Sequence, residues 1–131
     1  MANPNLLAAT TASGTTTYYT PGGTTAVVLL PNAASSGQVF KINQIVAANV
    51  NGSSAVNATV SVYTNGAVAQ GSAPSSGTGY PIVSTVSVPA NASLIVTDKT
   101  TALYLMEGTS ITVTSGTASG ITYSISYEVI S

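Results

Sequence analysis

The stretch Ile121-Thr-Tyr-Ser-Ile-Ser-Tyr-Glu-Val-Ile130 decides the fold class of this chain. Apolar or aromatic side chains occupy every second position, from Ile121 to Val129, and Ser, Thr and Glu lie between them. In a strand, this period of two places one set of side chains on each face. The stretch therefore predicts a strand with one face buried and the other open to solvent or to a partner.

The same period recurs upstream, in Ala55–Tyr63 and in Ser110–Thr114. No segment of helical length shows a period of 3.6, and the helix-favouring residues Glu, Lys, Arg and Gln are rare. The abundant Val, Thr and Tyr instead favour a pleated, half-buried surface. These patterns predict an all-β protein, a β-sandwich or jelly roll of about eight to ten short antiparallel strands.

Turn residues separate the expected strands. The pairs Asn51-Gly52 and Asn65-Gly66 predict tight hairpin turns, because both residue types tolerate positive φ. We expect strands at Leu6–Thr10, Thr15–Thr20, Thr24–Leu30, Val39–Asn49, Ala55–Tyr63, Ile82–Val88, Ser93–Thr97, Ala102–Met106, Ser110–Thr114 and Ile121–Ile130.

A chain of 131 residues is expected to form a single domain, residues 1–131. Two segments interrupt the alternation. The first 20 residues are of low complexity and predict either an assembly arm or an edge strand. Residues 67–79, AVAQGSAPSSGTG, predict a long surface loop, or an arm that orders against a neighbouring molecule.

Charge is nearly absent, with two Lys, three Asp or Glu, and no His or Cys. Without His or Cys, the many serines have no usual base to activate them, and a zinc or disulfide site has no ligands. Two lysines are too few for a phosphate-binding surface. The sequence therefore predicts a protein that is not an enzyme, with no catalytic, cofactor-binding or metal residue, no cofactor and no nucleic-acid partner.

The charged residues have ordinary structural interpretations. Asp98 and Glu107 flank a predicted hairpin, where they could meet only if the intervening strand doubles back. Lys99 is interpreted as a solvated turn residue, and Lys41 as a surface group at the start of a strand. Glu128 lies on the polar face of the last strand, where it is interpreted as an edge or interface charge that suppresses mispairing.

The seven tyrosines fall into two groups. Those within or beside strands predict core packing; they are Tyr63, Tyr80, Tyr104, Tyr123 and Tyr127. The pair Tyr18-Tyr19 lies in the polar N-terminal segment and predicts an anchor between subunits, because aromatic residues are enriched at interfaces.

No apolar run approaches the length of a membrane span, and the first nine residues lack the basic and apolar regions of a signal peptide. We therefore expect no membrane partner and synthesis in the cytoplasm without a signal peptide.

Residues 39–131 resemble the small all-β virion proteins of tailed phages, notably phages of marine bacteria and cyanobacteria. The resemblance is carried by NQIVAANVNGSSAVNATVSVY (43–63), VPANASLIVTDKTTALYLMEGTSITVTSG (88–116) and the terminal YSISYEVIS (123–131). Thr109 stands where the family pattern has an acidic residue. The resemblance implies a structural component of a virus particle.

The expected function is that of a phage virion structural protein, foremost a capsid decoration or cement protein that stabilises the head. Its expected partners are copies of itself, with a trimer the favoured stoichiometry, and the major capsid protein. Two alternatives stay open: a tail, neck or baseplate component, and, in a different class, a glycan-binding adhesin module. Exposed rings at Tyr18, Tyr19 or Tyr80 would favour the adhesin.

Overall fold

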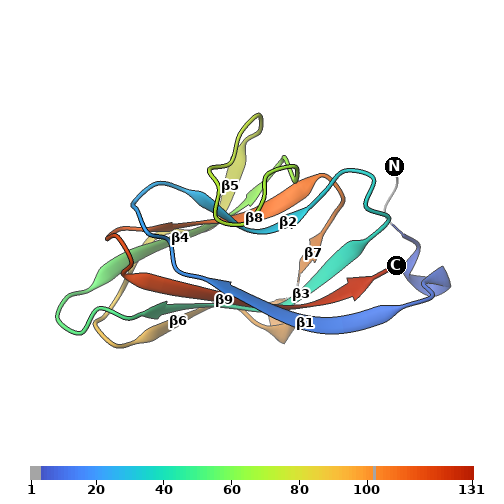
Figure 1. The fold of residues 1–131 in the computed structure, drawn as a ribbon. Coiled ribbons are helices and arrows are strands. Elements are labelled where there is room, and N and C mark those ends of the chain that lie inside the picture. The colour runs from blue at the N-terminus through green and yellow to red at the C-terminus, as the bar shows by residue number, and fades with distance from the viewer. Residues whose placement is uncertain (1–3, 102) are drawn as a thin grey trace.

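The computed structural model describes residues 4–101 and 103–131, and in these ranges nine strands form two antiparallel sheets. Figure 1 shows the sheets as two layers. Sheet A has the order β1 (Ala12–Tyr19), β9 (Ile121–Ile130), β3 (Val39–Asn49) and β6 (Ser93–Thr97), and β7 (Leu103–Leu105) also pairs with β3. Sheet B has the order β2 (Val27–Asn32), β8 (Thr109–Ser115), β4 (Val56–Tyr63) and β5 (Gly79–Val88).

The two sheets enclose one core, and this arrangement confirms the predicted all-β sandwich. In β9 the side chains of Ile121, Tyr123 and Ile125 are fully buried, while the intervening Thr122 and Ser124 are half-buried. β3, β4 and β8 add alternating apolar residues to the same core. The period of two in the sequence thus identified the buried face of the longest strands.

Most connections cross from one sheet to the other, and neither of the predicted tight Asn-Gly turns is formed. β4 and β5, which flank Asn65-Gly66, do pair antiparallel in sheet B, but the long loop 64–78 joins them. β3 and β4, which flank Asn51-Gly52, belong to different sheets. Neither Gly52 nor Gly66 has positive φ. Instead, the Asn51 side-chain oxygen accepts hydrogen bonds from the Ser53 and Ser54 N–H groups at 2.9 and 3.2 Å, so that a side chain shapes the turn.

The N-terminal segment also differs from prediction. The expected strand at Leu6–Thr10 is absent, and Leu6–Ala8 form a short 3-10 helix, η1. Asn5 explains the change, because its side-chain oxygen accepts a hydrogen bond from Leu7 N–H at 3.0 Å. Residues Ala12–Tyr19 then form β1, the edge strand of sheet A, which was one of the two predicted alternatives for this segment. Residues 1–3 lie outside the described residues.

Two buried asparagines, Asn32 and Asn49, connect the sheets. Asn32 ends β2 in sheet B, and its Nδ2 donates to the carbonyl of Leu105 in sheet A at 3.0 Å. Asn49 ends β3 in sheet A, and its Nδ2 donates to the carbonyl of Val88 in sheet B at 2.8 Å. Each amide also organises the turn beyond its strand, which is why Asn can be buried at both positions.

The long loop between β4 and β5 folds over the edge of β2. Gly71 N–H donates to the Val28 carbonyl at 2.8 Å, and Val28 N–H donates to the Ser72 carbonyl at 2.9 Å. Gln70 Nε2 donates to the Leu29 carbonyl at 2.8 Å. Gly71 has φ of +85°, and a Cβ there would lie 2.9 Å from the Tyr19 hydroxyl, so glycine is required by both conformation and space.

The predicted hairpin around Asp98 and Glu107 is not formed. β6 and β7 pair with successive parts of the same strand, β3, rather than with each other. The short helix η2 (Lys99–Thr101) follows Asp98 and separates the two strands. The chain therefore continues in one direction along β3. Ala102, the first residue of the strand expected at Ala102–Met106, lies outside the described residues.

Candidate functional site: a groove and an open sheet edge

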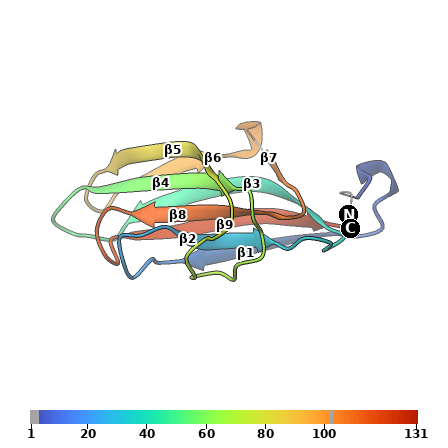
Figure 2. The same ribbon diagram turned by 90° about the horizontal axis from the view of Figure 1, so that it is seen from above.

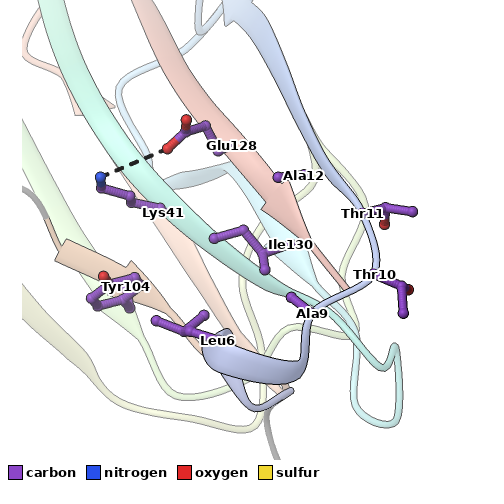
Figure 3. Close-up of a pocket in the computed structure, with 9 residues that line it drawn as sticks. All are labelled: Leu6, Ala9, Thr10, Thr11, Ala12, Lys41, Tyr104, Glu128 and Ile130. Atoms are coloured by element: carbon purple, nitrogen blue, oxygen red, sulfur yellow. Dashed lines mark ion pairs between the residues drawn. The ribbon is translucent and has the colours of Figure 1, made fainter.

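A groove of about 480 Å³ lies on the outer face of sheet A. Figure 3 shows its walls: Leu6 of η1 and Tyr104 of β7 face each other, and Ile130 of β9 lies between the elements. Leu6 is 47% exposed and Tyr104 is 49% exposed, so their apolar surfaces line an open hollow. The residues that line it are Leu6, Ala9, Thr10, Thr11, Ala12, Lys41, Tyr104, Glu128 and Ile130.

An ion pair closes one end of the groove. Lys41 Nζ lies 3.8 Å from Glu128 Oε2, across the register position at which β3 and β9 pair these two residues. Both side chains are more than a third exposed, so solvent weakens their attraction. The edge position predicted for Glu128 is wrong, because β9 lies between β1 and β3 inside sheet A.

The other carboxylates serve local structure. Asp98 accepts hydrogen bonds from the hydroxyl and the N–H of Thr100, and these bonds lower the pKa of the Asp98 carboxyl. Glu107 Oε1 accepts a hydrogen bond from Gly37 N–H at 3.0 Å. Among the described residues, no three His, Cys, Asp or Glu side chains lie close enough together to hold a metal ion.

A second hollow, of about 500 Å³, lies further along the outer face of sheet A. The residues that line it all carry polar or charged side chains and are Asn43, Gln44, Asp98, Lys99, Thr100 and Ser126. Asn43 is the extra residue of a β-bulge between Ile42 and Gln44. The two hollows together bring four of the five charged residues of the chain to one face.

The tyrosines separate into core and surface groups in a way that the sequence did not predict. Tyr123 is fully buried and donates its hydroxyl to the Thr114 carbonyl; burial raises the pKa of its phenol to about 12. Tyr127 packs on Phe40 with ring centroids 5.2 Å apart, and burial raises its pKa. The core positions predicted for Tyr80 and Tyr104 are wrong, since these side chains are 61% and 49% exposed.

The N-terminal tyrosines divide as well. Tyr18 is 71% exposed on the outer face of β1. Tyr19 points to the opposite face, where it packs against the core and against Gly71. Tyr18 and Tyr80 lie on opposite sides of the sandwich, because β1 adjoins β2 and β5 adjoins β6 (Figure 2). Tyr18, Tyr19 and Tyr80 therefore do not form one aromatic platform.

Three of the four sheet edges carry features that oppose pairing with another chain. The loop at Gly71 and Ser72 covers β2. β5 contains Pro81 and a bulge, at which Thr85 has φ of +49°. β6 and β7 form a short edge that η2 interrupts. Bulges, prolines, short strands and covering loops are the usual protections of sheet edges.

The fourth edge, β1, carries none of these features. Its eight residues, ASGTTTYY, pair with β9 in unbroken register and include no charge and no proline. Within the described part of the chain, no main-chain hydrogen bond joins the outer side of β1 to another segment, and the loop over β2 reaches β1 through one side-chain bond, from Gln70 Nε2 to Thr17 Oγ1 at 3.1 Å. The sequence predicted an arm or an edge strand in the first 20 residues. That this edge is the open one follows only from the structure, which shows how the other three edges are protected.

The fold and its surfaces define a two-sheet antiparallel β-sandwich with one open edge strand and an adjacent groove. Comparisons of the chain with protein-family models, with curated proteins and with solved structures found no match. Among the described residues, no helix is both long and apolar enough to cross a membrane.

Proposed function

We propose that the chain is a non-enzymatic structural protein of a phage virion, a decoration or cement protein that binds copies of itself and the major capsid protein on the head. The observation that carries the proposal is the charge-free, unprotected edge of β1. A sheet edge of this kind is a template for pairing with another chain, and monomeric proteins protect such edges.

The surface composition supports the same proposal. Only five residues of the chain carry a formal charge, so a contact between subunits desolvates few ions. Large apolar side chains remain exposed, among them Leu7 at 99% and Ile95 at 58%. A single contact of ordinary size removes roughly 1,600 Å² from water, and many copies on a shell multiply that gain through avidity.

The chemistry of the charged groups supports a role without catalysis. Asp98 and Glu107 are bound to neighbouring hydrogen-bond donors, and Glu128 pairs with Lys41. The chain contains no His or Cys that could act as a base or nucleophile. The resemblance of residues 39–131 to phage virion proteins supplies the biological setting.

The test is the copy number and position of the protein in purified particles, measured by quantitative mass spectrometry and by electron cryomicroscopy. Hundreds of copies on the head, and heads that lose resistance to heat without the protein, are the expected results. A dozen copies or fewer at one vertex, with tailless but heat-resistant heads after deletion, would instead establish a neck, tail or baseplate component.

The groove favours one function of a different class, glycan binding. An exposed aromatic ring beside a carboxylate and an ammonium group can stack on a sugar while the charged groups bind hydroxyls. Tyr104, Glu128 and Lys41 supply these groups. A glycan array with the wild type and with Tyr104→Ala tests this function, and Tyr80→Ala is the control, because Tyr80 is also an exposed tyrosine but lies on β5 of sheet B and does not line the groove. Binding that survives Tyr104→Ala would exclude the groove.

A further inference from the structure

The main chain of β1 has a defined outward-facing set of groups. Thr11 and Ser131 exchange two main-chain hydrogen bonds, at 3.0 and 3.1 Å, so Thr11 belongs to a hydrogen-bonded pair. Such pairs alternate along an antiparallel ladder. The N–H and C=O groups of Ser13, Thr15 and Thr17 therefore also point toward β9. The groups that point away from the sheet are those of Ala12, Gly14, Thr16 and Tyr18.

The sequence of β1 is complementary to itself in antiparallel pairing. Hydrogen bonds to a second copy require outward-facing residues to stand opposite each other, and all four do so when the two-fold axis passes through Thr15. Gly14 then faces Thr16, and Ala12 faces Tyr18 of the second copy. In both pairs the larger side chain stands opposite a smaller one, so that neighbouring side chains across the two-fold axis do not collide.

The groove extends this complementarity. Ala12 both pairs with Ile130 and lines the groove, together with Leu6 and Ala9. The same two-fold axis brings the exposed Tyr18 ring of the second copy to the Ala12 end of the groove. The exposed ring and the hollow that receives it thus lie on one strand, six residues apart in the sequence.

We propose that two copies of this chain pair through β1 in antiparallel register about Thr15, with Tyr18 of each copy seated at the mouth of the groove of the other. This pairing joins the two A sheets into one continuous sheet across the dimer. It rests on the proposed function only in that both require self-association. It predicts a two-fold dimer in place of the trimer that the sequence analysis favoured.

The size of the contact predicts a weak dimer. A strand of eight residues is about 27 Å long. Two such strips and two covered tyrosine rings bury roughly 1,000 Å², which is near the lower limit for specific interfaces. The dimer should therefore form at high concentration in solution, and on a shell the fixed spacing of the copies would favour it.

A cysteine placed at the axis tests the register directly, since the chain contains no other Cys. In the proposed register Thr15 faces Thr15 of the second copy in a non-hydrogen-bonded pair, at a separation that a disulfide can span. Thr15→Cys should give a disulfide-linked dimer under mild oxidation. Ser13→Cys, which is equally exposed but faces Thr17, is the matched control and should give at least tenfold less.

A proline on the outward side of β1 tests the interface without a disulfide bond, because it removes a hydrogen bond expected between the two copies. Thr16→Pro removes an N–H that points away from β9 and should leave the monomer folded. Sedimentation equilibrium up to roughly 0.5 mM is needed, because interfaces of this size bind weakly. We expect the wild type to show a dimer and Thr16→Pro to raise the dimer Kd at least tenfold, with an unchanged circular dichroism spectrum.

Two results would overturn the inference. A wild type that stays monomeric throughout, with no Thr15→Cys dimer, would mean that β1 does not pair with a second copy. A trimer unaffected by Thr16→Pro would place the contact elsewhere. Neither result contradicts a role on the head, because the composition of purified particles tests that role separately. If the protein dimerises in solution but is absent from particles, the role on the head is refuted and the pairing through β1 still stands.

Discussion

β1 and β2 are edge strands on the same side of the sandwich, one in each sheet (Figure 2). They differ in the burial of their side chains and in the hydrogen bonding of their outer main chain. β2 carries Val28 and Leu29, both fully buried, and the loop at Gly71 and Ser72 satisfies its main chain. β1 is rich in threonine, is largely exposed, and has an open main chain.

The difference shows how one molecule can avoid aggregation and still associate. A strand with apolar side chains and an open main chain is an aggregation site, so β2 requires its cover. A polar strand gains little from non-specific contacts, so β1 can remain open and select a partner through its register. Four substitutions test this contrast, beginning with the largest expected effect.

Removal of the Asn32 side chain should break the attachment of β2 to sheet A. In Asn32→Ala the carbonyls of Gln38 and Leu105 and the hydroxyl of Ser36 lose a buried partner. We expect a loss of about 3 kcal/mol in the free energy of unfolding, measured in urea. Asn57→Ala, at an exposed position of β4, should change it by less than about 0.5 kcal/mol. A loss below about 1 kcal/mol for Asn32→Ala would mean that water replaces the amide.

Proline substitutions separate the two sides of β1. Thr15→Pro removes an N–H that bonds to β9, and we expect a loss of about 3 kcal/mol. Thr16→Pro removes an N–H that faces outward, and its cost to the monomer should stay below about 1 kcal/mol. Thermal unfolding at low protein concentration compares the two variants. Equal losses of stability in the two variants would show that the N–H groups of β1 that point away from β9 are assigned incorrectly.

Gly71→Ala should lift the loop from β2. The positive φ of 85° and the nearby Tyr19 ring both oppose a Cβ, and we expect a loss of about 2 kcal/mol. Amide hydrogen exchange at Val28 should accelerate, because its N–H bonds to the Ser72 carbonyl. Gly22→Ala is the control, since a Cβ there meets nothing within 4 Å. Unchanged exchange at Val28 would show that the cover does not depend on Gly71.

The smallest expected effect is that of pH near neutrality, because the chain has no His or Cys. Hydrogen bonds from the Thr100 hydroxyl and N–H lower the pKa of Asp98 in the folded state, so its small contribution to stability is present above the pKa of the unfolded carboxyl and is lost as pH falls. The phenol of Tyr123 ionises near 10 when unfolded and near 12 when folded, so stability is complete below pH 10 and declines above it.

Unfolding in urea across the pH range checks this prediction. Stability should be flat from about pH 5 to 9, and the alkaline decline should be smaller in Tyr123→Phe. Dimer formation should be equally flat over this range, since neither β1 nor β2 carries a charged side chain. A transition near neutral pH would contradict both expectations.

Three strands were predicted with the bounds that the structure has, and strict alternation of apolar residues marks the last of them. Val39–Asn49, Ser93–Thr97 and Ile121–Ile130 have the predicted bounds. Predictions based on turn residues were less accurate, because Asn51 organises its turn through its side chain and Asn5 caps a 3-10 helix. The candidate site was only partly predictable. The sequence indicated an interface role for Tyr18-Tyr19 of β1, but it did not indicate the groove, because the groove is formed by residues from η1, β1, β3, β7 and β9.

The sequence by itself determined the all-β class and the buried face of the strictly alternating strands such as β9, because a period of two is a local property of the strand. It also determined the scarcity of charge and of catalytic side chains. Only the tertiary structure decided which strands lie at the edges and that the loop covers β2 while β1 remains open. These features depend on contacts between residues far apart in the chain, such as Gly71 with Val28, and no local pattern encodes such pairings.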